Sequence, residues 1–341
     1  MSRFAVAPMM DWTDRHCRYF HRLLSKRAVL YTEMITTGAL LHGDLARHLD
    51  FDAAEQPLVL QLGGSEPADL AQAAVLAQHW GYHAVNLNCG CPSQRVQRGA
   101  FGACLMAEPK LVRDCVTAMR DAVALPVSVK HRIGIDRHES YEFVRDFIGI
   151  VAQGGATEFI VHARNAWLQG LSPKQNRELP PLRYELVYRL KRDFPDLRIV
   201  INGGIGDLSQ AQQHLREVDG VMLGRAAYHD PWLLSGVDAQ VFGTTAAITD
   251  RLGIVEQLHR YASTMVGQGV PLRAITRHVL GLFNGLPGAR LWRQRLSDAA
   301  LLRANEPQLL LSAAQLVTLP VTTPGPMPVA MPMPVAPGPV A

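Results

Sequence analysis

One stretch decides the interpretation of this chain: Asn86-Leu87-Asn88-Cys89-Gly90-Cys91-Pro92. Residues 84–88 alternate apolar and polar side chains, a pattern typical of a short strand. A glycine and a proline then end the strand and open a polar loop that carries Arg95 and Arg98. We therefore expect Cys91 just beyond the carboxyl end of a strand, where its thiol can exchange a proton. The alternative for a single cysteine is a small buried side chain beside a tight turn.

Seven further runs of this kind accompany it along the chain. The eight expected strands cover residues 4–9, 29–32, 58–62, 84–88, 127–131, 159–162, 199–202 and 220–224. Helical patterns follow several of them, at residues 67–80 with Ser65 as the N-cap, 109–123, 139–153 and 208–216. Strands that alternate with helices predict parallel βαβ units, and eight units in about 225 residues predict a closed (β/α)8 TIM barrel over residues 1–242. An open, doubly wound sheet is the alternative that this periodicity also allows.

A polar residue ends nearly every expected strand. These residues are Gln61, Asn88, Lys130, His162 and Asn202. Because the carboxyl ends of the strands of such a barrel meet at one mouth, we expect the five side chains to form a site there. Lys130 and His162 have two interpretations: a Schiff-base lysine with a general base, as in an aldolase-like enzyme, or two contacts to an electron-accepting ring.

The loops after the last two strands are rich in glycine. Asn202-Gly203-Gly204 follows the seventh strand, and Gly224-Arg225 follows the eighth. Glycines let backbone N–H groups approach an anion, and these are the loops in which such barrels often bind phosphate. Pro8-Met9-Met10, after the first strand, offers an apolar edge for a flat ring, or a plug for the end of the barrel. The combination favours a flat cofactor that carries one phosphate.

The alternation of strands and helices stops after about residue 242. Helices are expected over residues 250–266, 271–284 and 289–303, with a fourth from Pro307, which predicts a separate helical domain over residues 243–317. Residues 250–303 contain eight arginines, no lysine and three acidic residues. Arg290 and Arg293 would share one helix face beside Trp292. This face is either an ordinary solvated surface or a contact surface for phosphate groups. Residues 318–341, without charge and rich in proline, are expected to form a disordered tail.

The composition limits the function classes. Hydrophobic residues make up 48% of the 341 residues, charged residues 19%, and the net charge is +4, which alone does not indicate nucleic acid. No apolar run approaches the roughly 20 residues of a membrane span, and the start lacks a signal-peptide pattern. Five irregularly spaced cysteines indicate free thiols in the cytoplasm. No second pair of cysteine or histidine residues follows Cys89 and Cys91 at zinc-site spacing, so no metal site is expected. We also expect the protein to be a monomer.

Three motifs carry a resemblance to a known family. They are residues 86–92 with their continuation to Gly102-Ala103, Met9-Met10-Asp11-Trp12-Thr13-Asp14, and Tyr31-Thr32-Glu33-Met34. Together they resemble the tRNA-dihydrouridine synthases, specifically the A-type branch of that family. The similarity extends from about Phe4 to about Leu302.

The resemblance implies an FMN-containing (β/α)8 barrel followed by a helical domain that binds tRNA. The implied FMN contacts are Pro8, Met9, Met10, Gln61, Lys130, His162, Asn202, Gly203, Gly204, Gly224 and Arg225. Cys91 would be the catalytic proton donor, and Asn88 would contact the target uracil. The implied tRNA contacts are Lys174, Arg177, Arg290 and Arg293.

The resemblance also implies a reaction. NADPH would reduce FMN, Lys130 would help the flavin to carry negative charge, and the reduced flavin would pass a hydride to C6 of a uracil while Cys91 protonates C5. A thiol with a pKa of about 8.5 is protonated near neutral pH yet able to release its proton. The base must leave the RNA stack to reach a barrel mouth, so the target is a loop nucleotide, here uridines 20 and 20a of the tRNA D-loop.

Two other functions remain open at this point. A flavin barrel that acts on a free pyrimidine, like the dihydroorotate or dihydropyrimidine dehydrogenases, would share the barrel and the FMN site but would not need an arginine-bearing helical domain. A non-catalytic RNA-binding protein would need the arginines but neither Cys91 nor the polar strand ends.

Overall fold

A computed structural model describes residues 3–244 and 250–319 and contains one eight-stranded parallel sheet. The strands are β1 (Phe4–Val6), β2 (Leu30–Thr36), β3 (Leu58–Gly63), β4 (Ala84–Cys89), β5 (Val127–Arg132), β6 (Glu158–His162), β7 (Arg198–Asn202) and β8 (Gly220–Leu223). From β2 to β8 each strand pairs with the next one in sequence, and β1 pairs with β8. All eight expected strands are confirmed, with ends shifted by a few residues.

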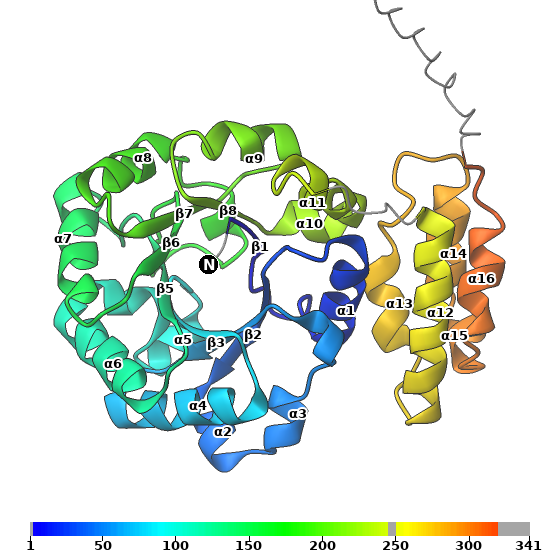
Figure 1. Ribbon diagram of the computed structural model, residues 1–341, viewed down its shortest axis with the longest axis horizontal. Helices are drawn as coiled ribbons and strands as arrows, with labels where there is room; N and C mark the ends of the chain where they lie inside the picture. The colour runs from blue at the N-terminus through cyan, green and yellow to red at the C-terminus, as the bar shows by residue number, and fades with distance from the viewer. Residues whose placement is uncertain (1–2, 245–249, 320–341) are drawn as a thin grey trace, which may run out of the picture.

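The sheet closes on itself between its first two strands. The amide of Val6 donates to the carbonyl of Val29 at 2.9 Å, and the amide of Val29 donates to the carbonyl of Phe4 at 2.9 Å. These bonds join the two ends of the strand order, and the strands surround a common centre in Figure 1. The (β/α)8 barrel is therefore confirmed, and the alternative of an open sheet is wrong.

Helices cover the outside of the barrel. They are α1 (Arg15–Leu24), α2 (Thr37–His42), α3 (Leu45–Leu49), α4 (Pro67–Trp80), α5 (Gln94–Arg98), α6 (Pro109–Ala122), α7 (Tyr141–Ala152), α8 (Tyr184–Asp193), α9 (Leu208–His214), α10 (Arg225–His229) and α11 (Val237–Gln240). Several begin at a side chain that accepts backbone N–H groups, such as Asp14 before α1 and Ser140 before α7. The expected cap of α4 is wrong: Glu66, and not Ser65, holds that position, and its side chain makes no capping bond.

Two apolar layers stabilise the barrel. A small cluster that includes Ala5, Tyr31, Ile160 and Met222 packs in its interior, and a much larger one packs between the strands and the surrounding helices. The strands bury both faces, which is why β7 and β8 are nearly continuous apolar runs, whereas the polar residues inside β3 and β4, Gln61 and Asn86, are buried and hydrogen-bonded to each other.

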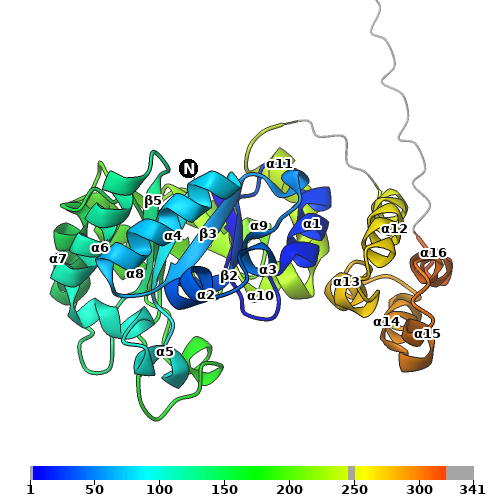
Figure 2. The same ribbon diagram turned by 90° about the horizontal axis from the view of Figure 1, so that it is seen from below.

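A group of helices follows the barrel and lies beside α1 in both views (Figures 1 and 2). Its members are α12 (Arg251–Gly267), α13 (Arg273–Val279), α14 (Ala289–Ser297), α15 (Ala299–Arg303) and α16 (Gln308–Ala314). We call residues 250–319 the helical segment. The expected helix over residues 271–284 is shorter than expected, and the one over residues 289–303 divides at Asp298, whose side chain caps α15.

Trp292 belongs to the core of the helical segment. It is fully buried, its indole N–H donates to the carbonyl of Val279 at 3.1 Å, and its ring meets Phe283 edge to face at 4.8 Å. Trp292 is therefore a neighbour of Arg290 and Arg293 in sequence but does not share their exposed surface. An aromatic ring beside two arginines in sequence points inward here because neighbouring residues of a helix occupy different faces.

Two remaining expectations concern membrane spans and the end of the chain. Among residues 3–244 and 250–319, no helix is long and apolar enough to cross a membrane. Most of the expected tail, residues 320–341, lies outside the described residues, as do residues 245–249 between the barrel and the helical segment. The division of the chain at residue 242 stays a prediction.

Candidate active site

The loop after β4 holds Cys91 at the mouth of the barrel. The side-chain oxygen of Asn88 accepts the backbone N–H groups of Gly90 and Cys91, each at 3.0 Å. The carbonyl of Cys91 accepts the amide of Ala103 at 2.9 Å, which ties the start of the loop to its end. Cys91 is half-buried and follows the strand directly, as predicted. Hydrogen bonds at both its amide and its carbonyl hold the backbone of Cys91, so the position from which the thiol projects is defined.

A chain of side-chain amides lies beneath this loop. Asn88 donates to the oxygen of Gln61 at 2.8 Å, Gln61 donates to the oxygen of Asn86 at 2.7 Å, and Asn86 donates to the hydroxyl of Ser128 at 3.0 Å. An amide nitrogen carries two hydrogens, so Asn88 and Gln61 each keep one N–H beyond these bonds. Both can therefore donate to a carbonyl oxygen or a ring nitrogen at the mouth.

Lys130 projects from β5 toward the neighbouring strand ends. Its ammonium donates to the side-chain oxygen of Asn202 at 3.1 Å, and Asn202 donates in turn to the carbonyl of Met222 at 2.7 Å. Burial, reinforced by the charge of Arg132, lowers the pKa of Lys130 to about 7. A lysine with such a pKa changes charge easily near neutral pH, which suits a group that faces developing negative charge.

Arg132 is a functional candidate that the sequence analysis missed. It is buried, and its guanidinium donates to the carbonyls of Gly90 at 3.2 Å and Asn176 at 3.0 Å. Burial lowers the pKa of Arg132 to about 10. Arg132 therefore joins the Cys91 loop to the loop after β6. The signal was available, because Arg132 follows Lys130 by two residues and so shares its side of the strand.

Two glycines after β7 leave room that a side chain would fill. Gly203 and Gly204 have φ values of +112° and +72°, which other residues rarely adopt. A Cβ atom on Gly203 would lie 2.5 Å from Cδ2 of His162, and one on Gly204 would lie 2.5 Å from a methyl carbon of Leu182. Burial lowers the pKa of His162 well below its usual value, so its ring is neutral. A bare backbone and a neutral imidazole thus lie side by side at this strand end.

Arg225 connects β8 with the loop after β6. Its guanidinium forms an ion pair with Glu178 at 2.7 Å and also donates to the carbonyl of Arg177 at 3.4 Å. Gly224 precedes it and lies near Met9, because a Cβ atom there would be 3.7 Å from the sulfur of Met9. The carboxyl ends of β1 and β8 thus meet. Pro8 and Met9 are half-buried, and Met10 is exposed, so an apolar edge borders the mouth.

The long loop between β6 and α8 is held together by one buried amide. The side chain of Asn176 accepts the amide of Trp167 at 2.7 Å and donates to the carbonyl of Trp167 at 2.9 Å. Lys174 and Arg177, which flank it, are both exposed. Loop residues are usually mobile, but this anchor gives the two basic side chains a defined backbone.

This loop and the Cys91 loop lie side by side at the lower edge of Figure 2. The amide of Gln97 donates to the carbonyls of Pro92 at 2.8 Å and Leu168 at 2.7 Å, and so bridges them. An open cavity of about 520 Å³ lies between the two loops. Residues 84–107 and 163–177 contain five arginines and lysines and no aspartate or glutamate. Over these residues the two loops therefore carry an excess of basic residues.

The structure brings most of the predicted site residues together and leaves two apart. The strand-end residues, the glycine loops, Cys91 and Arg177 meet at the barrel mouth. Arg290 and Arg293 lie on α14 of the helical segment, exposed and on one helix as expected. Arg293 donates to the side-chain oxygen of Asn284 at 2.9 Å.

The donor set at the mouth fits a flavin with one phosphate. It supplies amides, a lysine and a neutral histidine for a flat ring, and glycine backbone with an arginine for an anion. Within residues 3–244 and 250–319, no group of three or more histidine, cysteine or acidic side chains could hold a metal ion. The five cysteines are all free thiols.

Comparisons with known proteins agree with this geometry. Residues 5–318 match the dihydrouridine synthase (Dus) family. A protein from Pseudomonas putida named tRNA-dihydrouridine(20/20a) synthase is 59% identical over 305 residues, which cover 89% of this chain and 90% of that protein. A protein of the same name from Escherichia coli K12 is 56% identical over 316 residues, covering 92% and 91%.

One solved structure supports the fold alone. It is a 2-naphthoyl-CoA reductase in complex with 2-naphthoyl-CoA, which superposes with a TM-score of 0.54 at 12% identity. The match covers 69% of this chain and 49% of that one.

Proposed function

This chain belongs to the dihydrouridine synthase family, and on that premise we propose that it reduces uridines of the tRNA D-loop to dihydrouridine. It is an oxidoreductase that acts on tRNA. The names of its relatives extend the proposal to positions 20 and 20a. One observation carries the chemistry: a cysteine held by backbone hydrogen bonds stands above a cluster of donors at a barrel mouth, between two loops with an excess of basic residues.

We propose FMN as the cofactor and NADPH as its reductant. When bound, FMN supplies the hydride. Gln61, Lys130, His162 and Asn202 would hold its ring, with Pro8, Met9 and Met10 along one edge. Backbone groups of Gly203, Gly204 and Gly224 would hold its phosphate together with Arg225. The close approach at Gly203 and Gly204, where a Cβ atom would collide with His162 or Leu182, supports this assignment.

The residues of the chain divide the remaining work. Lys130, with its pKa of about 7, would hold positive charge against the ring and oppose the negative charge that reduction brings. Cys91 would donate a proton to C5 of the uracil. The free N–H of Asn88 would bind a uracil carbonyl, while its oxygen keeps the Cys91 loop in place. Arg132 would hold that loop against the loop after β6.

The substrate must enter as an extruded nucleotide, because a base within a stack cannot reach a recessed mouth. Lys174 and Arg177 at the mouth, with Arg290 and Arg293 on α14, would bind phosphate groups of the surrounding RNA. We further propose that the protein works in the cytoplasm as a monomer. Light scattering of the purified protein tests the oligomeric state.

Absorbance and reoxidation test the proposal together. The purified protein should show flavin bands, and after reduction by NADPH its reoxidation should accelerate when unmodified tRNA is added. Flavin bands without a response to tRNA would favour an enzyme that acts on a free pyrimidine. No flavin, even after FMN is added, would contradict the cofactor site.

A further inference from the structure

The helical segment meets the barrel at a compact polar cluster. The carboxylate of Asp14, at the start of α1, accepts from Nη2 of Arg277 at 2.8 Å and from Nε2 of His278 at 2.9 Å. The hydroxyl of Tyr228, on α10, lies 3.1 Å from Nδ1 of His278. Nε of Arg277 also lies 2.9 Å from Nε2 of His278, so Asp14, Arg277, His278 and Tyr228 form one connected network. Arg277 and His278 are neighbours on α13, so one helix supplies both donors.

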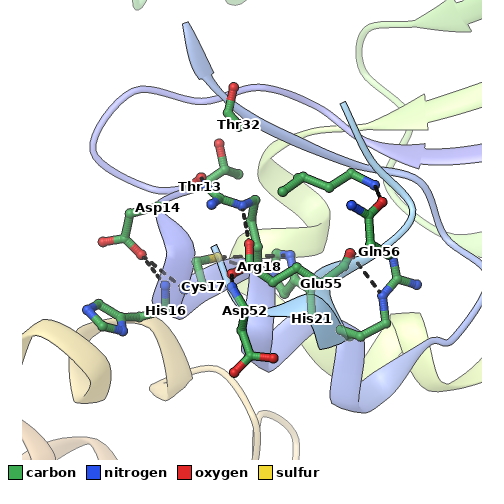
Figure 3. A network of polar contacts seen from close by, with 12 residues as sticks. Thr13, Asp14, His16, Cys17, Arg18, His21, Thr32, Asp52, Glu55 and Gln56 are labelled. Carbon is green, nitrogen blue, oxygen red and sulfur yellow. Dashed lines mark hydrogen bonds and ion pairs between the residues drawn. The ribbon is translucent and has the colours of Figure 1, made fainter. Parts of the chain in front are cut away.

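Asp14 uses its two oxygens for different partners. Oδ1 accepts the backbone N–H groups of His16 and Cys17, each at 3.0 Å, and thereby caps α1 (Figure 3). Oδ2 accepts only the donors of the helical segment named above. Burial raises the pKa of Asp14, but the hydrogen bond and charge of His278, with the other donors, outweigh it and leave the pKa well below its usual value. The carboxylate is therefore charged when it meets Arg277.

Arg277 also reaches the loop between β1 and α1. The same Nη2 donates to the backbone carbonyl of Asp11 at 2.9 Å. Asp11 has a φ of +65°, and the carbonyl of Met9 accepts the amides of Trp12 at 3.1 Å and Thr13 at 3.0 Å. The loop is thus a tight turn that begins at Met9. Holding Asp11 fixes the backbone of the residues that border the proposed ring site.

The cluster contacts α10 as well. Tyr228 stacks on Trp12 with ring centres 4.4 Å apart and planes 10° from parallel, so the loop after β1 and α10 pack against each other. α10 begins at Arg225, one turn before Tyr228. His278 therefore contacts the helix that carries the proposed phosphate ligand, and Arg277 contacts the loop that carries the proposed ring edge.

We propose that Arg277 and His278 are positioning residues through which the helical segment sets the geometry of the FMN site. They act through α10 and through the loop between β1 and α1 that begins at Met9, and they touch neither the cofactor nor the reacting base. This inference rests on the proposed FMN site. It gives the helical segment a second role, because Arg290 and Arg293 face solvent on α14, whereas Arg277 and His278 face the barrel.

The Asp14→Asn variant separates the two roles of that carboxylate. An asparagine keeps one oxygen for the cap of α1 but places an N–H opposite the donors of Arg277 and His278. Fluorescence titration of the FMN-stripped protein should show a dissociation constant for FMN about tenfold higher than in the wild type, within the usual range of coupling between sites. Arg277→Gln should give a similar change, and Arg277→Lys, which keeps the charge but not the second contact, a smaller one.

Matched controls and additivity sharpen the test. Asp44→Asn alters another capping aspartate, at α3, and Arg273→Gln removes a charge one turn earlier on α13; neither should change FMN affinity. The double variant Asp14→Asn with Arg277→Gln should lose less FMN affinity than the sum of the two single losses, because both substitutions remove the same contact between Asp14 and Arg277.

A purely structural contact would behave differently. It would lower the unfolding temperature of the FMN-stripped protein and leave the dissociation constant for FMN unchanged, and that result would overturn the proposal. If the wild type binds no FMN, the proposed cofactor itself is wrong, which is a separate failure that this inference would share.

A second measurement needs no variant. Coupling is reciprocal, so FMN binding should slow amide hydrogen exchange in α13 of the wild-type protein. Equal exchange in α13 with and without FMN would overturn the proposal even if FMN binds tightly. Slower exchange there would support it, because α13 supplies none of the proposed FMN contacts.

Discussion

The barrel mouth buries its basic side chains, whereas the surface of α14 exposes them. Lys130 and Arg132 are enclosed and hydrogen-bonded to named acceptors, and burial lowers the pKa of each, to about 7 and about 10. Arg290 and Arg293 stand exposed on a short helix. A group that acts on a reacting bond gains from a fixed, water-poor setting, because electrostatic effects are stronger there. A group that binds an RNA phosphate gains from remaining solvated, because little free energy is then needed to release the RNA.

The two regions also differ in their effect on the stability of the fold. An enclosed charge requires desolvation, and its neighbours must supply hydrogen bonds to offset it. Exposed charges contribute little to stability and are easily exchanged. Variants of the mouth should therefore change chemistry or stability steeply, and variants of α14 should change affinity in a salt-dependent way.

The largest effect is expected at Cys91. The Cys91→Ala variant should retain FMN but form dihydrouridine roughly 10²–10⁴-fold more slowly, because the proton donor is lost. Single-turnover reoxidation of the reduced protein by tRNA measures this rate. Cys91→Ser should be similarly slow, since a hydroxyl releases its proton poorly at neutral pH, while Cys115→Ala, buried in α6, should keep the wild-type rate. An unchanged rate in Cys91→Ala would remove Cys91 from the chemistry.

The next effect concerns stability at Lys130. Its pKa is about 7 in the folded, FMN-free protein and about 10.4 in an unfolded chain. Between these values the unfolded chain binds more protons than the folded protein. The free energy of unfolding therefore rises with pH over this range and decreases as the pH falls toward 7. The Lys130→Met variant lacks this dependence. The stability advantage of the variant should therefore shrink by roughly 3–5 kcal/mol from pH 7 to pH 10.

Urea unfolding of both proteins at several pH values gives this difference. Lys110→Met, which removes an exposed lysine on α6, should follow the wild type at every pH. Parallel curves for the wild type and Lys130→Met would mean that Lys130 keeps an ordinary pKa in the folded protein.

The smallest effect is expected on α14. Replacing Arg290 and Arg293 together by alanine should weaken tRNA binding about tenfold and reduce the slope of log affinity against log salt by about two. Filter binding over a salt series measures both quantities. Reduction of the flavin by NADPH should be unchanged. Arg145→Ala, on α7 of the barrel, serves as the control. Impaired flavin reduction with intact tRNA affinity would reverse the roles assigned to the two regions.

Sequence reasoning predicted the barrel because its signals are local. Strand runs repeat eight times, with helical patterns after several of them and a polar residue at five strand ends, and parallel pairing brings those ends to a single mouth. Gln61, Asn88, Lys130, His162 and Asn202 follow from position alone. Arg132 was not predicted because the expected strand ended at residue 131, although the two-residue period places Arg132 on the same side as Lys130.

Other features had no local signal. The contact between Asp14 and Arg277 joins residues 263 positions apart, and the local sequence around either residue does not predict the other as its partner. The sequence shows Trp292 beside two exposed arginines, but its packing against Phe283 determines that its side chain points inward. Which face of a short helix is buried depends on partners that only the assembled fold provides.

The pairing of β1 with β8 also dictates an order of events during synthesis. Val6 cannot meet Leu223 until more than 200 further residues have been made, roughly 10–40 s at the usual pace of translation. The loop that begins at Met9 must then wait again, because Arg277 emerges later still. A nascent chain therefore carries its first strand without its β8 partner for most of its production, and the proposed cofactor site matures late.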